Sequence, residues 1–361
     1  MGTFARSRPR AAAGRYHTSR IVFAGEHTVI ESTTTVGIGP TSDRDAGRRH
    51  GTEKLRRFLE AYWLRPENAL WMTLRSLVLE SAPWAAPSID VSCGDGVFSF
   101  LHHGGVFDPS FDVFGAADVA DAVKALDADI FDYVDEHYQP AIRTAPRCTI
   151  DVGTDCKPSM LEKAGKLGLY RRLVHHDNNE KLPFEDESFR TVYCNAAYWV
   201  RNIDGFLSEL ARITRPDGFL ILQVKMDCLR DYTLRFAHDI LGDRVLDLLE
   251  RGRFSCWVSL ADRSTWERRF RRAGLHIRQA VPFITRTHAQ IWDIGLRPVA
   301  PLLMRMVDNL RPDVRETIKR DWVDLFLDLL TPFCDPSMDL FEAGEPGEIQ
   351  YVLSPDRGRA T

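Results

Sequence analysis

Residues 89–100 read IDVSCGDGVFSF, and this stretch decides the predicted fold. It begins as a short buried strand and continues through Gly94 and Gly96 as a tight turn. Glycine adopts backbone angles that other residues resist, and its missing side chain lets a ligand approach the main chain. The helix that follows offers free N–H groups to polar or anionic ligand groups. Asp90, before the turn, can orient the loop or a ligand amine.

The composition is that of an ordinary globular protein. The chain has 361 residues, of which 44% are apolar, and a formal net charge of -4. This length suits one large domain with insertions or two small ones. The charge gives no indication of a nucleic-acid partner. The 7 cysteines form no CxxC pair and no Cys/His pattern, which predicts reduced thiols in a cytoplasmic protein and no metal site. No run of about 18 apolar residues predicts a membrane span.

Strand and helix patterns alternate from residue 88 onward. Helices are predicted at residues 158–166, 203–214 and 265–273. The predicted strands are residues 88–91, 148–154, 173–176, 190–194, 219–224, 276–281 and 349–353. This alternation predicts an α/β fold with a doubly wound, mainly parallel seven-stranded sheet. Ligands of such sheets bind at the carboxyl ends of the strands.

The rest of the chain is predicted to form an extension, a helical cap and two insertions. Residues 1–50 are expected to be a partly flexible N-terminal extension, with a short hairpin at 21–36; a polar linker is expected at 41–52. Residues 51–84 predict a cap of two helices. The core spans 85–283, with an insertion at about 103–147. A helical substrate lid is predicted at 284–345, with helices at 292–308 and 314–330, and residues 346–361 hold the last strand and a tail.

The order of these motifs resembles class I S-adenosylmethionine-dependent methyltransferases of the small-molecule type, which have a Rossmann-like fold. In that family an acid precedes alternating glycines, and residues 90–96 match this pattern with Ser92 in place of the first glycine. The family's second strand ends in an acid that holds both ribose hydroxyls, and residues 153–161 match with Asp155. A carboxylate suits this role because its two oxygens can accept from two neighbouring hydroxyls.

Asp118 is the alternative to Asp155 as the ribose-binding acid. Asp155 lies 59 residues after Gly96 and Asp118 lies 22 residues after it, whereas about 20 is usual for a βαβ unit. We prefer Asp155 because the remaining strand ends follow it in step, which makes residues 103–147 an insertion. Asp118 is then expected to cap a helix.

The resemblance implies S-adenosyl-L-methionine as the cofactor and assigns residues to it. Asp177 would bond the adenine amino group with Asn178 behind it, and the segment from Cys194 would face the sulfonium and the acceptor. Residues 182–189 and 212–218 resemble the loop before the family's fourth strand and its helix-to-strand turn. The cofactor residues implied in this way are Asp90, Ser92, Gly94, Gly96, Asp155, Cys156, Asp177, Asn178 and Asn195.

The resemblance also implies methyl transfer by in-line displacement. The sulfonium methyl is already activated, so the protein aligns the reactants and excludes water. A general base is needed only if the nucleophile loses a proton early. Tyr198, at the end of the fourth strand, and His288, in the lid, are the candidate catalytic residues. Other groups that can serve as a base are His102, His103, His175, His176 and Asp227.

The predicted reaction methylates an O, N or C atom of a small organic acceptor in natural-product or cell-envelope biosynthesis. Residues 195–198 read NAAY, which faintly resembles the Asn-Pro-Pro-Tyr motif of amino-group methyltransferases, but both prolines are absent. A nicotinamide-dependent oxidoreductase is disfavoured because Ser99 stands where a third glycine is needed. A non-catalytic or regulatory protein and a macromolecular acceptor are alternatives, although the acidic balance disfavours RNA. The sequence does not decide the oligomeric state and leaves a homodimer open.

Overall fold

A computed structural model describes residues 41–111, 113, 138–250, 253–294, 299–335 and 344–356. The hairpin predicted at 21–36, the alternative acid Asp118 and the final tail lie outside these residues. The described residues belong to one compact unit, which begins at Thr41.

A seven-stranded sheet forms the centre of this unit, in the order β5-β4-β1-β6-β7-β9-β8. The first five strands in this order pair in parallel, whereas β9 is antiparallel to both β7 and β8. The strands span β1 Ser88–Val91, β4 Ile150–Asp155, β5 Tyr170–His175, β6 Phe189–Cys194, β7 Thr214–Lys225, β8 Leu275–Ile284 and β9 Glu348–Pro355. The predicted doubly wound, mainly parallel sheet is confirmed. A separate pair, β2 Val106–Phe107 and β3 Ile142–Thr144, lies in the region predicted as an insertion.

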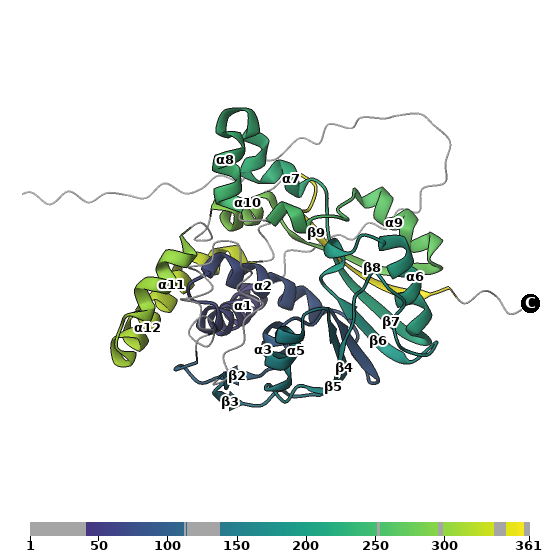
Figure 1. Ribbon diagram of the computed structural model, residues 1–361, viewed down its shortest axis with the longest axis horizontal. Helices are drawn as coiled ribbons and strands as arrows, with labels where there is room; N and C mark the ends of the chain where they lie inside the picture. Colours follow the sequence, from purple (N-terminus) through teal and green to yellow (C-terminus); the bar gives the residue numbers. More distant parts are fainter. Residues whose placement is uncertain are drawn as a thin grey trace, which may run out of the picture. The chain divides into compact units, whose positions relative to one another are not determined.

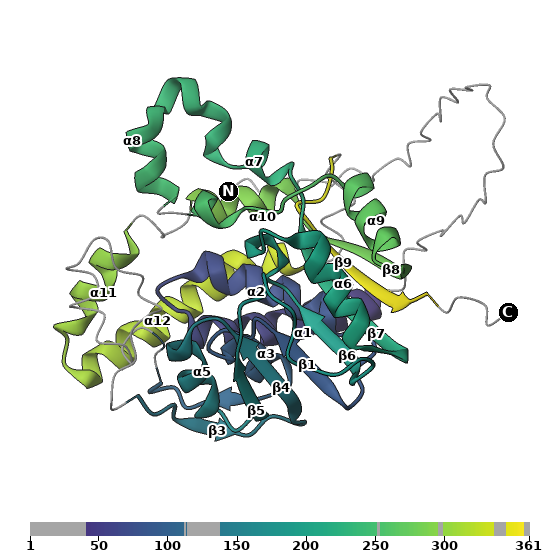
Figure 2. The same ribbon diagram turned by 45° about the vertical axis from the view of Figure 1, so that its right-hand side comes forward.

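Helices cover both faces of the sheet (Figures 1 and 2). One face carries α1 Thr41–Ala61, α2 Pro66–Leu79 and α3 Val97–His102, and the other carries α6 Ile203–Ile213 and α9 Arg263–Arg272. Alternate residues of one strand serve the two cores, since Tyr193 packs with the first set and Val192 and Cys194 pack with the second. Side chains of a strand point to opposite faces in turn, so each strand contributes to both layers.

The remaining helices follow the strands or form the C-terminal insertion. They are α5 Pro158–Gly165, α7 Leu229–Tyr232, α8 His238–Glu250, α10 Arg286–Ile294, α11 Ala300–Asp308 and α12 Pro312–Leu330. Short 3₁₀ turns are η2 Ala197–Trp199, η3 Leu234–Ala237, η4 Arg253–Cys256 and η5 Thr331–Cys334.

Local sequence explains where the helices of the second face begin. Asn202 caps α6 by accepting a hydrogen bond from the N–H of Gly205 at 3.2 Å, and Asp262 caps α9 by accepting from Thr265 at 2.6 Å. Such caps satisfy backbone donors that have no partner inside the helix. The buried residues of α6 recur every three or four positions, namely Ile203, Phe206, Leu207, Leu210 and Ile213. Helix α6 therefore buries one stripe against the sheet.

The prediction of a polar linker at 41–52 was wrong. These residues form the first part of α1, and Gly51 packs against Cys334 of η5, where an added Cβ would lie 3.3 Å from the Cys334 Cβ. Tertiary packing against the C-terminal helices therefore outweighs the polar composition. The single helix predicted at 292–308 was also wrong, since α10 and α11 are separate and Pro301 lies in the first turn of α11. Proline is favoured there and disfavoured in a helix interior.

Candidate functional site

Four parallel strands end at the same edge of the sheet. Val91 at the end of β1 pairs with Thr154 of β4 on one side and with Cys194 of β6 on the other. On the far side of β4, Asp155 pairs with His175 of β5. The loops that leave these strands, which begin at Ser92, Cys156, His176 and Asn195, therefore start side by side. Ligands of doubly wound sheets bind at such an edge.

The turn after β1 has the left-handed backbone angles that its glycines predict. Gly94 has a φ of 58° and Gly96 a φ of 76°, and Ser92 shares this conformation with a φ of 63°. Serine thus takes the backbone shape of the glycine that it replaces, at a cost that glycine would not incur. Its hydroxyl accepts a hydrogen bond of 2.6 Å from the Nδ2 of Asn178, which helps to hold it there.

The two glycines of this turn face different surroundings. A Cβ added at Gly96 would lie 3.0 Å from side-chain atoms of both Leu167 and Tyr170, so this position is closed by packing. A Cβ added at Gly94 would meet no atom within 4 Å among the residues that the structure describes, its two chain neighbours aside. The main chain at Gly94 is therefore open to an approaching group, whereas Gly96 lets the turn lie close to the segment after α5.

Asp155 joins the end of β4 to the glycine turn. Its Oδ2 accepts a hydrogen bond from the N–H of Gly94 at 3.0 Å, and its Oδ1 accepts from the N–H of Lys157 at 2.9 Å. A carboxylate has about four lone-pair sites, so each oxygen can accept a further hydrogen bond. Asp155 is half-buried and lies next to the open side of the turn, which suits the predicted role with ribose hydroxyls.

Asp90 lies beneath the turn and orients it from within the core. Its Oδ2 accepts hydrogen bonds from the hydroxyls of Ser99 in α3, at 2.6 Å, and Tyr170 in β5, at 2.8 Å. Burial, assisted by the nearby charge of Asp155, raises the pKa of Asp90 to about 6 against the two hydrogen bonds that lower it. Of the two roles that the sequence left open, these contacts fit orientation of the loop.

Two exposed residues that the resemblance assigns to the cofactor lie on the loops after β4 and β5; of these, Asp177 is the one predicted to bind the adenine. Asp177 is exposed, and its Oδ1 accepts from the N–H of Asn179 at 2.9 Å. Hydrogen bonds from Asn179 lower the pKa of Asp177. Cys156 is exposed, and its carbonyl accepts from the ring of His175 at 2.9 Å. Ionised Asp177 is therefore available as an acceptor at the rim, in line with its predicted role.

The two candidate catalytic residues have very different surroundings. Tyr198 lies in the 3₁₀ turn after β6, and burial raises the pKa of its hydroxyl. His288 is buried, and its Nδ1 accepts from the N–H of Thr285 at 3.1 Å while its Nε2 lies 2.8 Å from the carbonyl of Phe333. An Nδ1 that accepts leaves the proton on Nε2, which donates to Phe333. His288 therefore joins α10 to η5, and this geometry does not fit a catalytic base.

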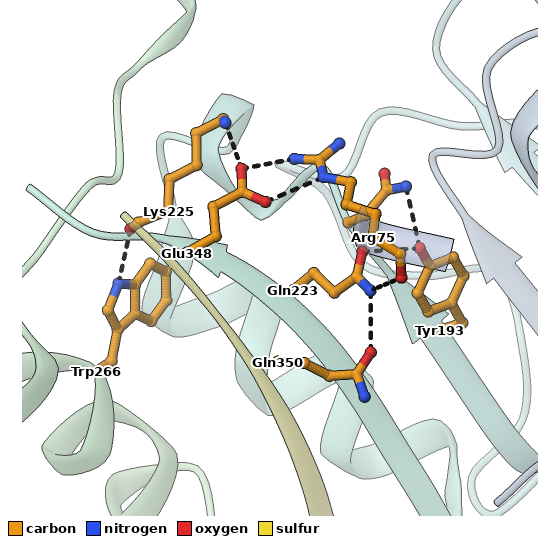
Figure 3. Close-up of polar contacts among 8 residues, drawn as sticks. Arg75, Tyr193, Gln223, Lys225, Trp266, Glu348 and Gln350 are labelled. Carbon is orange, nitrogen blue, oxygen red and sulfur yellow. Dashed lines mark hydrogen bonds and ion pairs between the residues drawn. The ribbon is translucent and has the colours of Figure 1, made fainter. Parts of the chain in front are cut away.

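A buried charged cluster that the sequence did not predict lies at the ends of β7 and β9. Glu348 accepts two hydrogen bonds from Arg75 of α2, at 3.0 and 2.8 Å, and another from Lys225, its partner across the two strands (Figure 3). Four aromatic rings surround the Lys225 ammonium, with centroids 4.4 to 5.6 Å away; they belong to Trp71, Tyr198, Trp257 and Trp292. Aromatic faces attract cations at such distances. The sequence feature that could have indicated this buried cluster is a charged residue next to an apolar strand, as at Glu348.

Comparison with known proteins identifies the chemistry. A family described as methyltransferase domain matches residues 139–222, from the segment before β4 into β7. Among curated proteins no sequence matches. The match confirms the predicted resemblance to class I S-adenosylmethionine-dependent methyltransferases, the enzyme class and the cofactor S-adenosyl-L-methionine. The glycine turn of residues 92–96 lies outside the matched segment.

Solved structures show a looser likeness. The [4+2]-cyclase SpnF has a TM-score of 0.41 and 14% identity, over 79% of this chain and 82% of that one. A putative sarcosine dimethylglycine methyltransferase from Galdieria sulphuraria has a TM-score of 0.39 and 14% identity, over 81% of this chain and 86% of that one. A possible histamine N-methyltransferase from Thermotoga maritima has a TM-score of 0.37 and 16% identity, over 64% of this chain and 86% of that one.

The residues at the strand ends fit S-adenosylmethionine. The open main chain at Gly94 offers a place for close approach, and Asp155 offers acceptor capacity beside it. Asp177 and Asn195 follow the ends of the flanking strands. The contact of each residue with the cofactor remains a prediction.

Proposed function

We propose that this protein transfers the methyl group of S-adenosylmethionine to an O, N or C atom of a small organic acceptor. The enclosure of Tyr198 supports a small acceptor. Trp71 of α2 and Trp292 of α10 lie with their ring centroids 4.8 Å apart, and both rings lie within 5.6 Å of the same Lys225 ammonium as Tyr198. Helices from the cap and from the insertion thus meet over the ends of β6 and β7, where a macromolecule would need open access.

The residues of the chain supply alignment and exclusion of water. Bound S-adenosylmethionine provides an activated methyl group, and the glycine turn with Asp155 would hold it at the ends of β1 and β4. Because burial raises the pKa of Tyr198, its hydroxyl stays protonated at neutral pH. In this proposal Tyr198 orients the acceptor and does not remove its proton. A water-poor enclosure strengthens such polar contacts.

Calorimetric titration with S-adenosylmethionine and S-adenosylhomocysteine, with NAD as the control, tests the first half of the proposal. We expect micromolar binding of both sulfur compounds and none of NAD. Incubation with S-adenosylmethionine that carries a labelled methyl group, together with fractions of small metabolites, RNA and protein, tests the second half. Label is expected in the small-metabolite fraction. Label in RNA or protein, or binding without transfer to any fraction, would contradict the proposal.

The setting of the reaction stays a prediction. Natural-product or cell-envelope biosynthesis, a cytoplasmic location and a homodimer are expectations from the sequence. In the described part of the chain, no helix is long and apolar enough to cross a membrane.

A further inference from the structure

A chain of buried amides starts at two main-chain carbonyls of α2. The Nε2 of Gln350 donates to the carbonyl of Val78 at 2.9 Å. The Nε2 of Gln223 donates to the carbonyl of Arg75 at 2.9 Å (Figure 3). A carbonyl can only accept, so neither amide can be reversed without placing two oxygens in contact. An unmet buried acceptor costs about 1–3 kcal/mol. Both glutamines therefore have one fixed orientation, and both are fully buried.

These two orientations determine the next two hydrogen bonds. The second hydrogen of the Gln223 amide goes to the Oε1 of Gln350 at 2.9 Å, which leaves the Gln223 Oε1 as an acceptor. The Tyr193 hydroxyl lies 3.1 Å from that oxygen and donates its only proton to it. The Tyr193 oxygen must then accept, and it does so from the Nδ2 of Asn195 at 3.1 Å.

The last hydrogen bond of this series fixes the orientation of the Asn195 amide. If this amide were reversed, its oxygen would face the Tyr193 oxygen, whose proton is already committed to Gln223. The Oδ1 of Asn195 is therefore the atom presented on the other side, and none of the residues that the structure describes donates a hydrogen bond to it. Asn195 is half-buried and follows Cys194, the register partner of Val91, so it lies beside the start of the glycine turn.

We propose that Tyr193, Gln223 and Gln350 are positioning residues that hold the Asn195 oxygen toward the cofactor, where it accepts a hydrogen bond from the α-ammonium of S-adenosylmethionine. This proposal rests on the proposed function. An ammonium group has donors and no acceptor, so only the oxygen of an amide can bind it. A reversed Asn195 would present its NH₂ group to the ammonium and repel it. The carbonyls of Val78 and Arg75 thus fix the orientation of every amide in this series, and the last amide, Asn195, selects a ligand group that donates a hydrogen bond.

Calorimetric titration with two compounds that share the adenosine and the thioether tests this assignment. S-Adenosylhomocysteine carries the ammonium, and 5′-methylthioadenosine lacks the amino-acid part. The variants are Asn195→Ala, which removes the acceptor, and Tyr193→Phe, which frees the amide to turn. Thr191→Val is the matched control, because Thr191 is a buried hydroxyl of the same strand that bonds only to the main chain of Ala85.

Both test variants are expected to bind S-adenosylhomocysteine about tenfold more weakly, as for loss of a hydrogen bond to a charged group. They should bind 5′-methylthioadenosine like the wild type, and the control should bind both compounds like the wild type. A purely structural role would weaken both compounds equally, and that result would overturn the proposal. Unchanged binding of both compounds by Asn195→Ala would also overturn it. If the wild type bound neither compound, the proposed function itself would fail, and this inference with it.

Discussion

Asp155 accepts a hydrogen bond of 3.0 Å from the N–H of Gly94, so the end of β4 fixes the shape of the turn that follows β1. Asp151, at the start of the same strand, does the same for the start of β1, because it accepts from the N–H of Ser88 at 2.8 Å. The two carboxylates make equivalent main-chain contacts at opposite ends of β4. Only Asp155 lies at the edge where ligands bind.

Asp155→Ala should weaken the binding of S-adenosylmethionine by about 1–3 kcal/mol, the range for polar partners left unmet. Asp151→Ala is the matched control, since it removes the equivalent contact and should leave the affinity unchanged. Calorimetric titration measures both. A comparable loss in Asp118→Ala, with Asp155→Ala unaffected, would show that the other acid binds the ribose.

Alanine substitutions in the glycine turn should separate binding from stability. Gly94→Ala adds a Cβ in open space, so its stability cost is limited to about 1–2 kcal/mol of left-handed strain, whereas its affinity for S-adenosylmethionine should fall strongly. Gly96→Ala adds the same strain and also clashes with Leu167 and Tyr170, so it should lose more stability. Urea unfolding and calorimetry measure the two effects. Equal loss of stability in both variants would contradict the difference in packing.

The buried carboxylate of Glu348 should be essential for stability. Glu348→Gln leaves Arg75 and Lys225 without the charge that both contact, and loss of one partner from a buried ion pair costs about 3–5 kcal/mol. Glu267→Gln is the control, because Glu267 pairs with Arg263 at the surface, where ion pairs contribute about 0–1 kcal/mol. Urea unfolding compares them. A loss below 1 kcal/mol for Glu348→Gln would mean that Arg75 and Lys225 do not depend on the negative charge of Glu348.

Asp90 should make the stability depend on pH in the acidic range. Burial raises the pKa of Asp90 to about 6 in the folded protein, so the folded state binds this proton more tightly than the unfolded state. Its contribution to the free energy of unfolding is therefore complete below about pH 4 and is lost as the pH rises to about 6, a change of about 3 kcal/mol. Asp90→Asn should lack this component. Urea unfolding at pH 4, 5, 6 and 7 measures the difference, and parallel curves for the two proteins would contradict it.

The sheet could be predicted because each of its strands has a local signature. The strand predicted at residues 88–91 has those bounds, and the others agree within a few residues except β7, which begins at Thr214 and not at Phe219. That difference arises because β7 pairs with β6 on both sides of an irregularity, from Phe189 with Thr214 to Thr191 with Phe219. A pairing of this kind depends on the neighbouring strand and has no local pattern.

The polar network behind the site could not be predicted for the same reason. Arg75 and Glu348 are 273 residues apart, and Gln223 and Gln350 are 127 apart. Each looks like an ordinary polar residue within its own segment. The histidines show the opposite error, since His288 has the chemistry of a base in the sequence and the contacts of a structural residue in the fold. Residue type indicates what a group can do, and only its partners decide what it does.

The place of β9 between β7 and β8 has a consequence for how the chain folds as it is synthesised. β8 reaches the sheet only through β9, and Lys225 meets Glu348 only after a further 123 residues have been made. Until then the edge of β7 has no neighbour, and Arg75 lacks its carboxylate. An unpaired strand edge is a template for association with other chains, and long-range pairing slows folding. We therefore expect chains released from the ribosome before β9 to aggregate. Chains still being synthesised should depend most on chaperones in the interval between the completion of β7 and that of β9.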